Sequence, residues 1–327
     1  SITKNRQSTQ VLRAILERAY GADRVPEGED FASELGHGWF NVAYRLRLRD
    51  GAEVVLKVAP PPDIVVMTYE RAMMRNELTA IALVQEHTTV PVPRVDFADT
   101  SGELIDAAWF VMPYVDADNM GILAEHGELT PLDEAMYGEQ LGAANRELNS
   151  IVGSHFGPLR GPGFPSWRAA FTAMIEDVLQ DGERADVDLG VEYDLIRQVI
   201  SRDADALDGV TEPRFVEWDL WSSNVMIRDG RIAAIIDHER AFFGDPLIEA
   251  GFTGTDLPAF GDPTAFLRGY SRGPLTEEEQ RRRRLYTLYL VLIMIIETRY
   301  RGHQDTRQFD WARERLAELM AQFGRTS

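Results

Sequence analysis

The sequence contains no cysteine among its 327 residues. Disulfides, thiolate nucleophiles and zinc–thiolate sites are therefore excluded, and a cytoplasmic location is expected. Long hydrophobic runs are also missing. The longest, Leu285 to Ile296, is interrupted only by Thr287 and is shorter than the roughly 20 apolar residues that a membrane-spanning helix needs. No apolar stretch near the N-terminus resembles a signal peptide, so we expect no membrane partner.

Basic residues are scarce. The chain has 34 lysines and arginines against 53 aspartates and glutamates, which gives a net charge of −19. Only Lys4 and Lys57 are lysines. A nucleic-acid partner is not expected, because binding to phosphate backbones needs a basic surface. Cationic small molecules, or a substrate whose negative charge is masked by Mg²⁺, suit this balance better. The six histidines show no pair at metal-ligand spacing, which argues against a zinc site.

The order of periodic segments predicts a small β-rich part followed by a larger helical part. A helix is expected over residues 1–24, and strand-like runs flank the turn at Asp50-Gly51. A second helix is expected over residues 66–86, then two strands near 95–99 and 109–114. Beyond Asp116 the pattern is helical, except for two apolar runs within residues 214–237 that are joined by Asp229-Gly230.

The strongest local pattern is Asp219-Leu220-Trp221-Ser222-Ser223-Asn224. This D-x-x-x-x-N spacing is typical of phosphoryl-transfer catalytic loops. There the aspartate orients the nucleophilic hydroxyl and accepts its proton, and the asparagine amide oxygen ligates Mg²⁺ without adding negative charge. Taken alone the pattern is weak, since a turn with Asx caps would contain the same residues.

A second candidate metal ligand, Asp237, ends the apolar run Ile232–Ile236, 13 residues after Asn224. A carboxylate in that position needs a partner or a metal ion to offset its desolvation, although it could also simply cap the next segment. The three residues Asp219, Asn224 and Asp237 in this order are more specific than any of them alone.

The N-terminal half supplies candidate phosphate-binding groups. Gly36 and Gly38 belong to a Gly-x-Gly-x-x-Asn pattern that ends at Asn41, and glycines allow backbone N–H groups to approach phosphate. Lys57 lies within an apolar strand and is expected to pair with phosphate, the alternative being an edge-strand lysine that reaches solvent. Glu77, on the following helix, is expected to hold that ammonium group, although alone it would be a solvated helix carboxylate.

Chain order, spacing and the Gly244-Asp245-Pro246 that follows Asp237 resemble the aminoglycoside phosphotransferase family. The resemblance extends from about Phe31 to Phe252. It implies an α+β, bilobal protein-kinase-like fold, with an N-terminal nucleotide-binding lobe over residues 1–112 and a mostly helical catalytic and acceptor-binding lobe over residues 113–327. The sequence departs from the usual His-Gly-Asp of the family at Glu217-Trp218-Asp219, which keeps the aspartate and changes what supports its loop.

By this resemblance the chain is an ATP-dependent kinase of small molecules, with GTP an open alternative donor. Lys57, held by Glu77, would bind the α and β phosphates beneath the loop of Gly36, Gly38 and Asn41. Asn224 and Asp237 would hold Mg²⁺, and Asp219 would be the catalytic residue. Adenine would lie at the connector between the lobes, against the residues Met112, Tyr114, Val115 and Ile236.

The expected acceptor is a small hydroxyl-bearing molecule, most simply an aminoglycoside or another amino-sugar compound, because acidic residues cluster in the C-terminal half. The acids concerned are Asp177, Asp181, Glu183, Asp256, Glu277, Glu278, Glu279 and Glu297. Choline, homoserine, sugars and macrolides remain alternative acceptors. A nucleotide-binding module without transferase activity is a further alternative, favoured only by Glu217. A protein kinase is disfavoured because the short segment between Asp237 and Gly244 leaves no room for an activation loop.

Overall fold

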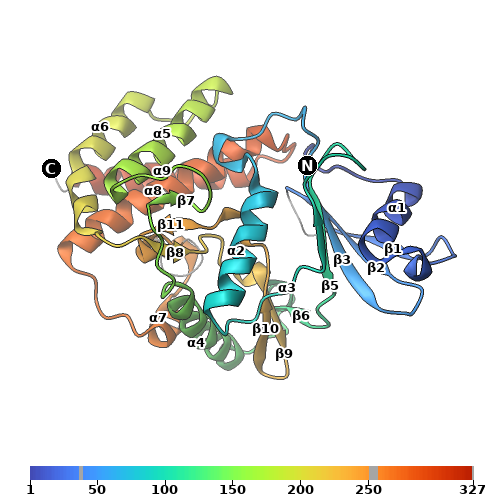
Figure 1. Cartoon of the computed structure of the whole chain (residues 1–327). Coiled ribbons are helices and arrows are strands. Elements are labelled where there is room, and N and C mark those ends of the chain that lie inside the picture. Colours follow the sequence, from blue (N-terminus) through green and yellow to red (C-terminus); the bar gives the residue numbers. More distant parts are fainter. Residues whose placement is uncertain (37–39, 250–256, 326–327) are drawn as a thin grey trace. The chain divides into compact units, whose positions relative to one another are not determined.

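The computed structural model (Figure 1) describes residues 1–36, 40–249 and 257–325. The chain divides into two compact units. The first unit contains Ser1–Val66 and Pro93–Asp116, and the second contains Met67–Val92 and Ala117–Ser327. The division therefore interleaves along the sequence, and the segment with the helix of Glu77 belongs to the second unit. The predicted lobe boundary at residue 112 stays a prediction.

The first unit is an antiparallel five-stranded sheet in the order β1-β2-β3-β5-β4. The Asp50-Gly51 turn joins β2 to β3 as predicted, because Gly51 takes the left-handed conformation (φ 85°) that this turn requires. Leu12, Ile15 and Leu16 of helix α1 pack on one face of the sheet. The elements of this unit are α1 (Thr9–Tyr20), β1 (Ala32–Leu35), β2 (Val42–Arg47), β3 (Glu53–Val58), β4 (Phe97–Asp99) and β5 (Trp109–Pro113).

The second unit is mostly helical and contains two small three-stranded sheets, β10-β9-β6 and β7-β11-β8. Its helices are α2 (Met73–His87), α3 (Met120–Glu125), α4 (Pro131–Leu148), α5 (Trp167–Arg184), α6 (Tyr193–Asp203), α7 (Thr264–Tyr270), α8 (Glu277–Tyr300) and α9 (Arg307–Arg325). Its strands are β6 (Asp118–Asn119), β7 (Gly157–Pro158), β8 (Arg214–Val216), β9 (Val225–Arg228), β10 (Arg231–Ile235) and β11 (Phe242–Gly244).

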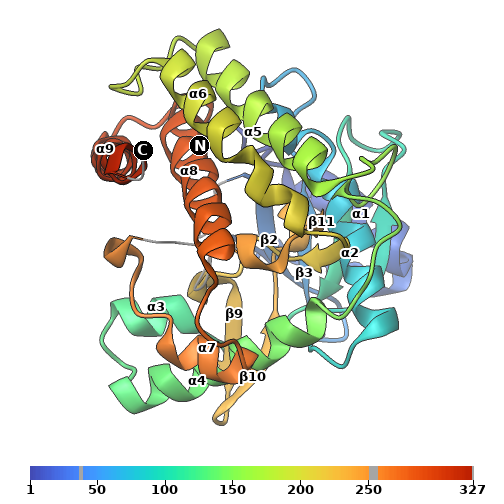
Figure 2. The same cartoon turned by 90° about the vertical axis from the view of Figure 1, so that its left-hand side faces the viewer.

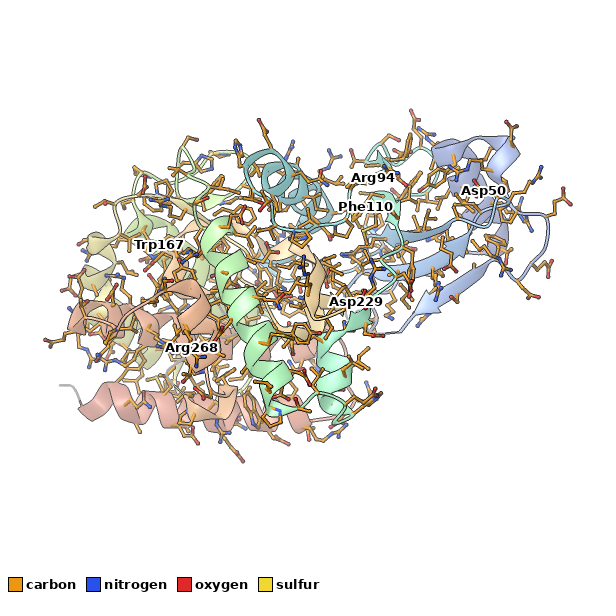
Figure 3. All side chains as sticks on the ribbon, turned by 90° about the horizontal axis from the view of Figure 1, so that it is seen from below. Asp50, Arg94, Phe110, Trp167, Asp229 and Arg268 are labelled. Atoms are coloured by element: carbon orange, nitrogen blue, oxygen red, sulfur yellow. The ribbon has the colours of Figure 1, made fainter. Side chains whose placement is uncertain are left out.

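Helix α8 is the centre of the larger core. Its apolar run Leu285–Ile296 is buried against α5, α6 and α9 (Figure 2), and Trp167, labelled in Figure 3, donates its indole N–H to Tyr286 at 2.7 Å. Thr276 and Glu279 form a capping box at the start of this helix. Within the part of the chain that the structure describes, no helix has the length and apolar character to span a membrane.

Two predicted helices are shorter than expected. Helix α1 begins at Thr9, because the Ser8 side chain accepts a hydrogen bond from the Val11 backbone N–H and so caps the helix there. Helix α2 begins at Met73, after a 3₁₀ turn over Thr68–Glu70 and the left-handed Ala72.

Candidate active site

The loop after β8 brings Asp219 and Asn224 into contact. Asn224 donates its amide Nδ2–H to the backbone oxygen of Asp219 at 2.8 Å and to the Asp219 carboxylate at 3.4 Å. With Nδ2 directed at Asp219, the Oδ1 atom of the same amide is the acceptor that can face a cation. The turn that closes this loop uses hydrogen bonds from Trp221 N–H to Asp219 O and from Asn224 N–H to Trp221 O, both 2.9 Å.

Asp237 lies beside this loop, because the backbone N–H of Ile236 donates to Asn224 O at 3.0 Å. Asp237 has φ 72° and ψ 53°, a left-handed conformation that is uncommon outside glycine and is often found at functional sites. Carboxylate oxygens of Glu77, Asp237 and Glu239 all lie within 4.8 Å of one another. Oxygen donors of this kind suit Mg²⁺, with Asn224 Oδ1 as a further donor.

Helix α2 contributes to this site through two neighbouring residues. Asn76 donates from its amide to the backbone oxygens of Glu239 at 2.9 Å and Ala241 at 2.8 Å, which holds α2 on the loop after Asp237. Glu77 is thereby placed with Asp237 and Glu239. Its expected pairing with Lys57 stays a prediction.

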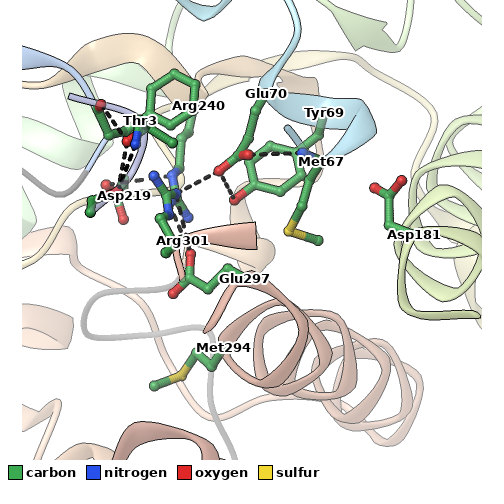
Figure 4. Close-up of polar contacts among 12 residues, drawn as sticks. Thr3, Met67, Tyr69, Glu70, Asp181, Asp219, Arg240, Met294, Glu297 and Arg301 are labelled. Atoms are coloured by element: carbon green, nitrogen blue, oxygen red, sulfur yellow. Dashed lines mark hydrogen bonds and ion pairs between the residues drawn. The ribbon is translucent and has the colours of Figure 1, made fainter. Parts of the chain in front are cut away.

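Arg240 is a site residue that the sequence reasoning missed. Its Nε lies 3.9 Å from Asp219 Oδ2, and its Nη2 lies 3.4 Å from Glu297 Oε2 on α8 (Figure 4). Burial raises the pKa of Asp219, the carboxylates of Asp237, Glu297 and Glu217 raise it further, and Arg240 opposes this shift. The only sequence signal was an arginine three residues after Asp237.

Charges of alternating sign continue from Arg240 away from the loop (Figure 4). Arg301 lies 3.5 Å from Glu297 and 2.5 Å from Glu70, and Gln308 donates to Glu297 at 2.8 Å. Burial would raise the pKa of Glu297, but Arg240 and Arg301 outweigh it and lower that pKa. Glu297 is therefore an ionised partner of two arginines.

Trp218 and Glu249 contact and support the loop that contains Asp219 and Asn224. Trp218 has φ 64°, at the position where the family pattern has glycine. Its buried ring packs edge-on against the ring of Tyr289, with 5.7 Å between the ring centres. Glu249, which is fully buried, accepts hydrogen bonds from the backbone N–H groups of Trp218 and Leu220 and from Asn145. Burial, together with the charge of Glu217, raises the pKa of Glu249 to about 8.

The Gly244-Asp245-Pro246 segment is an anchor to α8. Asp245 accepts hydrogen bonds from Arg282 Nε at 2.9 Å and from the Tyr286 hydroxyl at 2.7 Å. Its other oxygen accepts from the Leu247 N–H at 3.1 Å. These contacts hold the chain that follows the Asp237 loop.

In the first unit, Lys57 is buried on the sheet face opposite helix α1. It lies across from Phe110 in the strand register, and Val55 lies across from Met112, so these four side chains share one face. Tyr114, which follows β5, is covered by the Arg45 guanidinium at 4.0 Å from its ring centre.

The remaining predicted nucleotide-site residues are described only by their local surroundings. Asn41 is buried and Val115 is half-buried. Gly36 is the last residue described before the gap at residues 37–39, and Gly38 lies outside the described residues. Ile236 is half-buried in the second unit, where its backbone bonds to Asn224.

Most of the acids expected to line an acceptor pocket have partners within the fold. Asp181 is buried and bonds to Thr68 and Arg184, Glu183 pairs with Arg197, and Glu278 pairs with Arg282. Glu279 belongs to the α8 cap and Glu297 to the arginine chain, while Asp256 lies outside the described residues. The argument from these acids to a strongly cationic pocket is therefore weaker than the sequence suggested.

Known structures share this fold. The chain matches a thermostable mutant of aminoglycoside phosphotransferase APH(4)-Ia, solved with AMP-PNP and hygromycin B, with a TM-score of 0.66 and 19% identity, covering 96% of this chain and 98% of that one. It matches a candidate fructosamine-3-kinase from Thermobifida fusca with a TM-score of 0.64 and 20% identity, covering 95% and 100%. It matches the streptomycin–ATP–APH(2″)-IIa complex with a TM-score of 0.61 and 14% identity, covering 97% of both. The expected α+β, protein-kinase-like fold is confirmed.

A family model places the chain more specifically. The model described as the phosphotransferase enzyme family matches residues 32–286, and the chain belongs to that family. The prediction of an enzyme of the small-molecule kinase class is thereby confirmed. No curated protein matches the sequence.

Proposed function

We propose that this phosphotransferase moves the γ-phosphoryl group of ATP to a hydroxyl group of a small molecule. Asp219 orients the acceptor hydroxyl and takes its proton as the new O–P bond forms and the bond to the ADP oxygen breaks. Lys57 binds the α and β phosphates, with the segment of Gly36, Gly38 and Asn41 beside them. The adenine contacts are assigned to Met112, Tyr114, Val115 and Ile236.

One observation carries the proposal: the hydrogen-bonded pair Asp219–Asn224 lies directly beside Asp237. A general base, an amide oxygen and a carboxylate in this arrangement are what positioned phosphoryl transfer needs. ATP is the proposed donor because the related structures hold AMP-PNP or ATP, and GTP remains the alternative.

Magnesium is the proposed metal. When bound, it would neutralise negative charge on the phosphates, with Asn224 and Asp237 as its first ligands and Glu77 or Glu239 nearby. The test is calorimetry of ATP binding with and without Mg²⁺ in wild type and Asp237→Ala. We expect Mg²⁺ to tighten binding only in the wild type, and an equal effect in the variant would remove Asp237 from the metal site.

The acceptor that we propose is an aminoglycoside or another amino-substituted sugar. Related structures bind hygromycin B and streptomycin, another is a candidate fructosamine kinase, and the chain carries a net charge of −19. A neutral hydroxyl acceptor is the second candidate, because the internal pairing of Asp181, Glu183 and Glu297 leaves fewer carboxylates for ammonium groups.

A coupled ADP-release screen distinguishes the two acceptors. It would compare aminoglycosides and fructosamines with choline, homoserine, neutral sugars and macrolides. A cationic acceptor should show a KM that rises with ionic strength, because salt screens its attraction to the acidic protein. Turnover of neutral acceptors alone, with a KM insensitive to salt, would assign the second candidate instead.

A further inference from the structure

Glu217 and His238 form a buried pair that the proposed reaction does not use. Each side chain is 1% exposed, and His238 Nδ1 lies 2.7 Å from Glu217 Oε1. The other ring nitrogen, Nε2, lies 2.9 Å from the backbone oxygen of Ile235. Since a carbonyl only accepts, Nε2 carries a hydrogen and donates it to Ile235 O, while Nδ1 makes a close ion-pair contact with Glu217.

The two partners lie at the bases of two different loops. Glu217 comes two residues before Asp219, and His238 comes directly after Asp237. The loop of Asp219 leaves β8 after Val216, and the loop of Asp237 runs from the end of β10 into β11 at Phe242, which is the antiparallel partner of Val216. The pair therefore joins the loop of the candidate catalytic carboxylate to the loop of the candidate metal ligand near the edge of the sheet where one loop leaves β8 and the other enters β11.

We propose that Glu217 and His238 are positioning residues that keep the Asp219 loop and the Asp237 loop at a fixed distance and orientation to one another. Separating two buried groups of this kind leaves each without its compensating partner in a site closed to water, so the 2.7 Å contact opposes independent movement of the two loops. This role rests on the proposed phosphotransferase function and explains the departure from His-Gly-Asp. The imidazole is retained, but it comes from position 238, and the acid occupies position 217.

Phosphoryl transfer is sensitive to the relative position of these two loops. The proposed base acts on the acceptor hydroxyl, and the proposed metal ligands act on the side of the donor phosphates. A displacement of about 1 Å between these groups can lower the rate of transfer by about 100-fold. Nucleotide affinity depends mainly on other groups and should change much less. A loss in kcat with little change in nucleotide Kd is therefore the expected signature.

The experiment uses the full chain and four variants: Glu217→Gln, Glu217→His, His238→Glu, and the exchanged double variant E217H/H238E. We expect each single variant to lower kcat by about tenfold or more, with ATP Kd within about threefold of wild type. The exchanged variant restores an acid–imidazole pair and should recover most of the lost kcat. Leu179→Ala, in the α5 core, is the control for a general loss of stability.

Hydrogen exchange provides a readout that does not depend on finding the acceptor. Glu217→Gln should speed amide exchange in both residues 217–224 and residues 236–241, whereas Leu179→Ala should not single out these loops. Faster exchange only in the mutated loop would overturn the proposal. So would single variants with wild-type kcat, or a folded exchanged variant no better than the worse single one. Absence of transfer to every acceptor in wild type would instead refute the proposed function, and the exchange result would still decide the role of the pair.

Discussion

At the scale of single residues, the proposed chemistry depends on how the charge of Asp219 is balanced. Three carboxylates and burial favour its protonated form, and Arg240 is the nearby cation that opposes them. Glu297 fixes that arginine from α8. In the proposed mechanism Arg240 would therefore keep Asp219 ionised and available as a base, although its Nε lies 3.9 Å from the carboxylate, beyond direct hydrogen-bond distance.

Replacing Arg240 with glutamine should raise the pKa of Asp219 further, since the main opposing charge is lost. We expect the acid limb of the pH profile of kcat/KM to move to higher pH. Arg299→Gln, which removes an exposed arginine of α8, is the control and should leave the profile unchanged. An unshifted acid limb in Arg240→Gln would show that Arg240 does not act on the base.

A second residue-scale prediction concerns Glu249, whose pKa in the folded state is about 8 against an ordinary value of 4.5. Between these pH values the folded chain keeps a proton that the unfolded chain has lost. Stability should therefore fall as pH rises from about 4.5 to 8, by up to about 1.4 kcal/mol per unit from this group. When the free energy of unfolding is measured by denaturant titration across this pH range, it should fall less steeply with pH in Glu249→Gln than in wild type. The exposed Glu125→Gln is the control, and an identical slope in Glu249→Gln would contradict the account.

At the scale of elements, the sequence predicted those helices and turns that depend on interactions between residues close together in the chain. The Asp-Gly hairpin and the buried helix around Leu285–Ile296 follow from turn chemistry and hydrophobic pattern. The D-x-x-x-x-N segment closes on itself through the hydrogen bond from Asn224 to Asp219, a contact between residues only five apart, which is within the range of local sequence reasoning. Strands β6, β7 and β11 have two or three residues each and depend on distant partners, which no local pattern reveals. The contacts of Arg240 with Glu297 and of Glu217 with His238 join segments far apart in the sequence for the same reason.

The end of α5 offers a prediction at this scale. Asp186 has φ 53°, its N–H bonds to Glu183 O, and the next N–H, of Val187, bonds to Gly182 O, which is a Schellman motif. Glycine takes this left-handed conformation without the steric cost that aspartate bears. Asp186→Gly should therefore raise the free energy of unfolding by about 0.5–1 kcal/mol, measured by denaturant titration. Asp188→Gly, nearby without positive φ, is the control, and a loss of stability in Asp186→Gly would contradict this reading.

At the scale of the whole molecule, the large negative charge is less of a substrate signal than it first suggests. Many of the acids pair with arginines, as in Asp181 with Arg184, Glu183 with Arg197, and Asp205 with Arg281. Few lysines are needed, because arginine binds carboxylates through two donors at once. Lys57 differs from these surface cations because it is buried. It lies on the face of the first unit's sheet to which we propose that the nucleotide binds.

The most direct test of the central claim is single-turnover phosphoryl transfer to an acceptor identified in the screen, in wild type and in Asp219→Asn. The substitution keeps the size of the side chain and removes the carboxylate, so ATP binding should persist while the rate of phosphate-ester formation falls by about 100-fold or more. Calorimetry with ATP would establish that binding is retained. Wild-type transfer in Asp219→Asn would contradict the account, and Asp219 would not be the catalytic base.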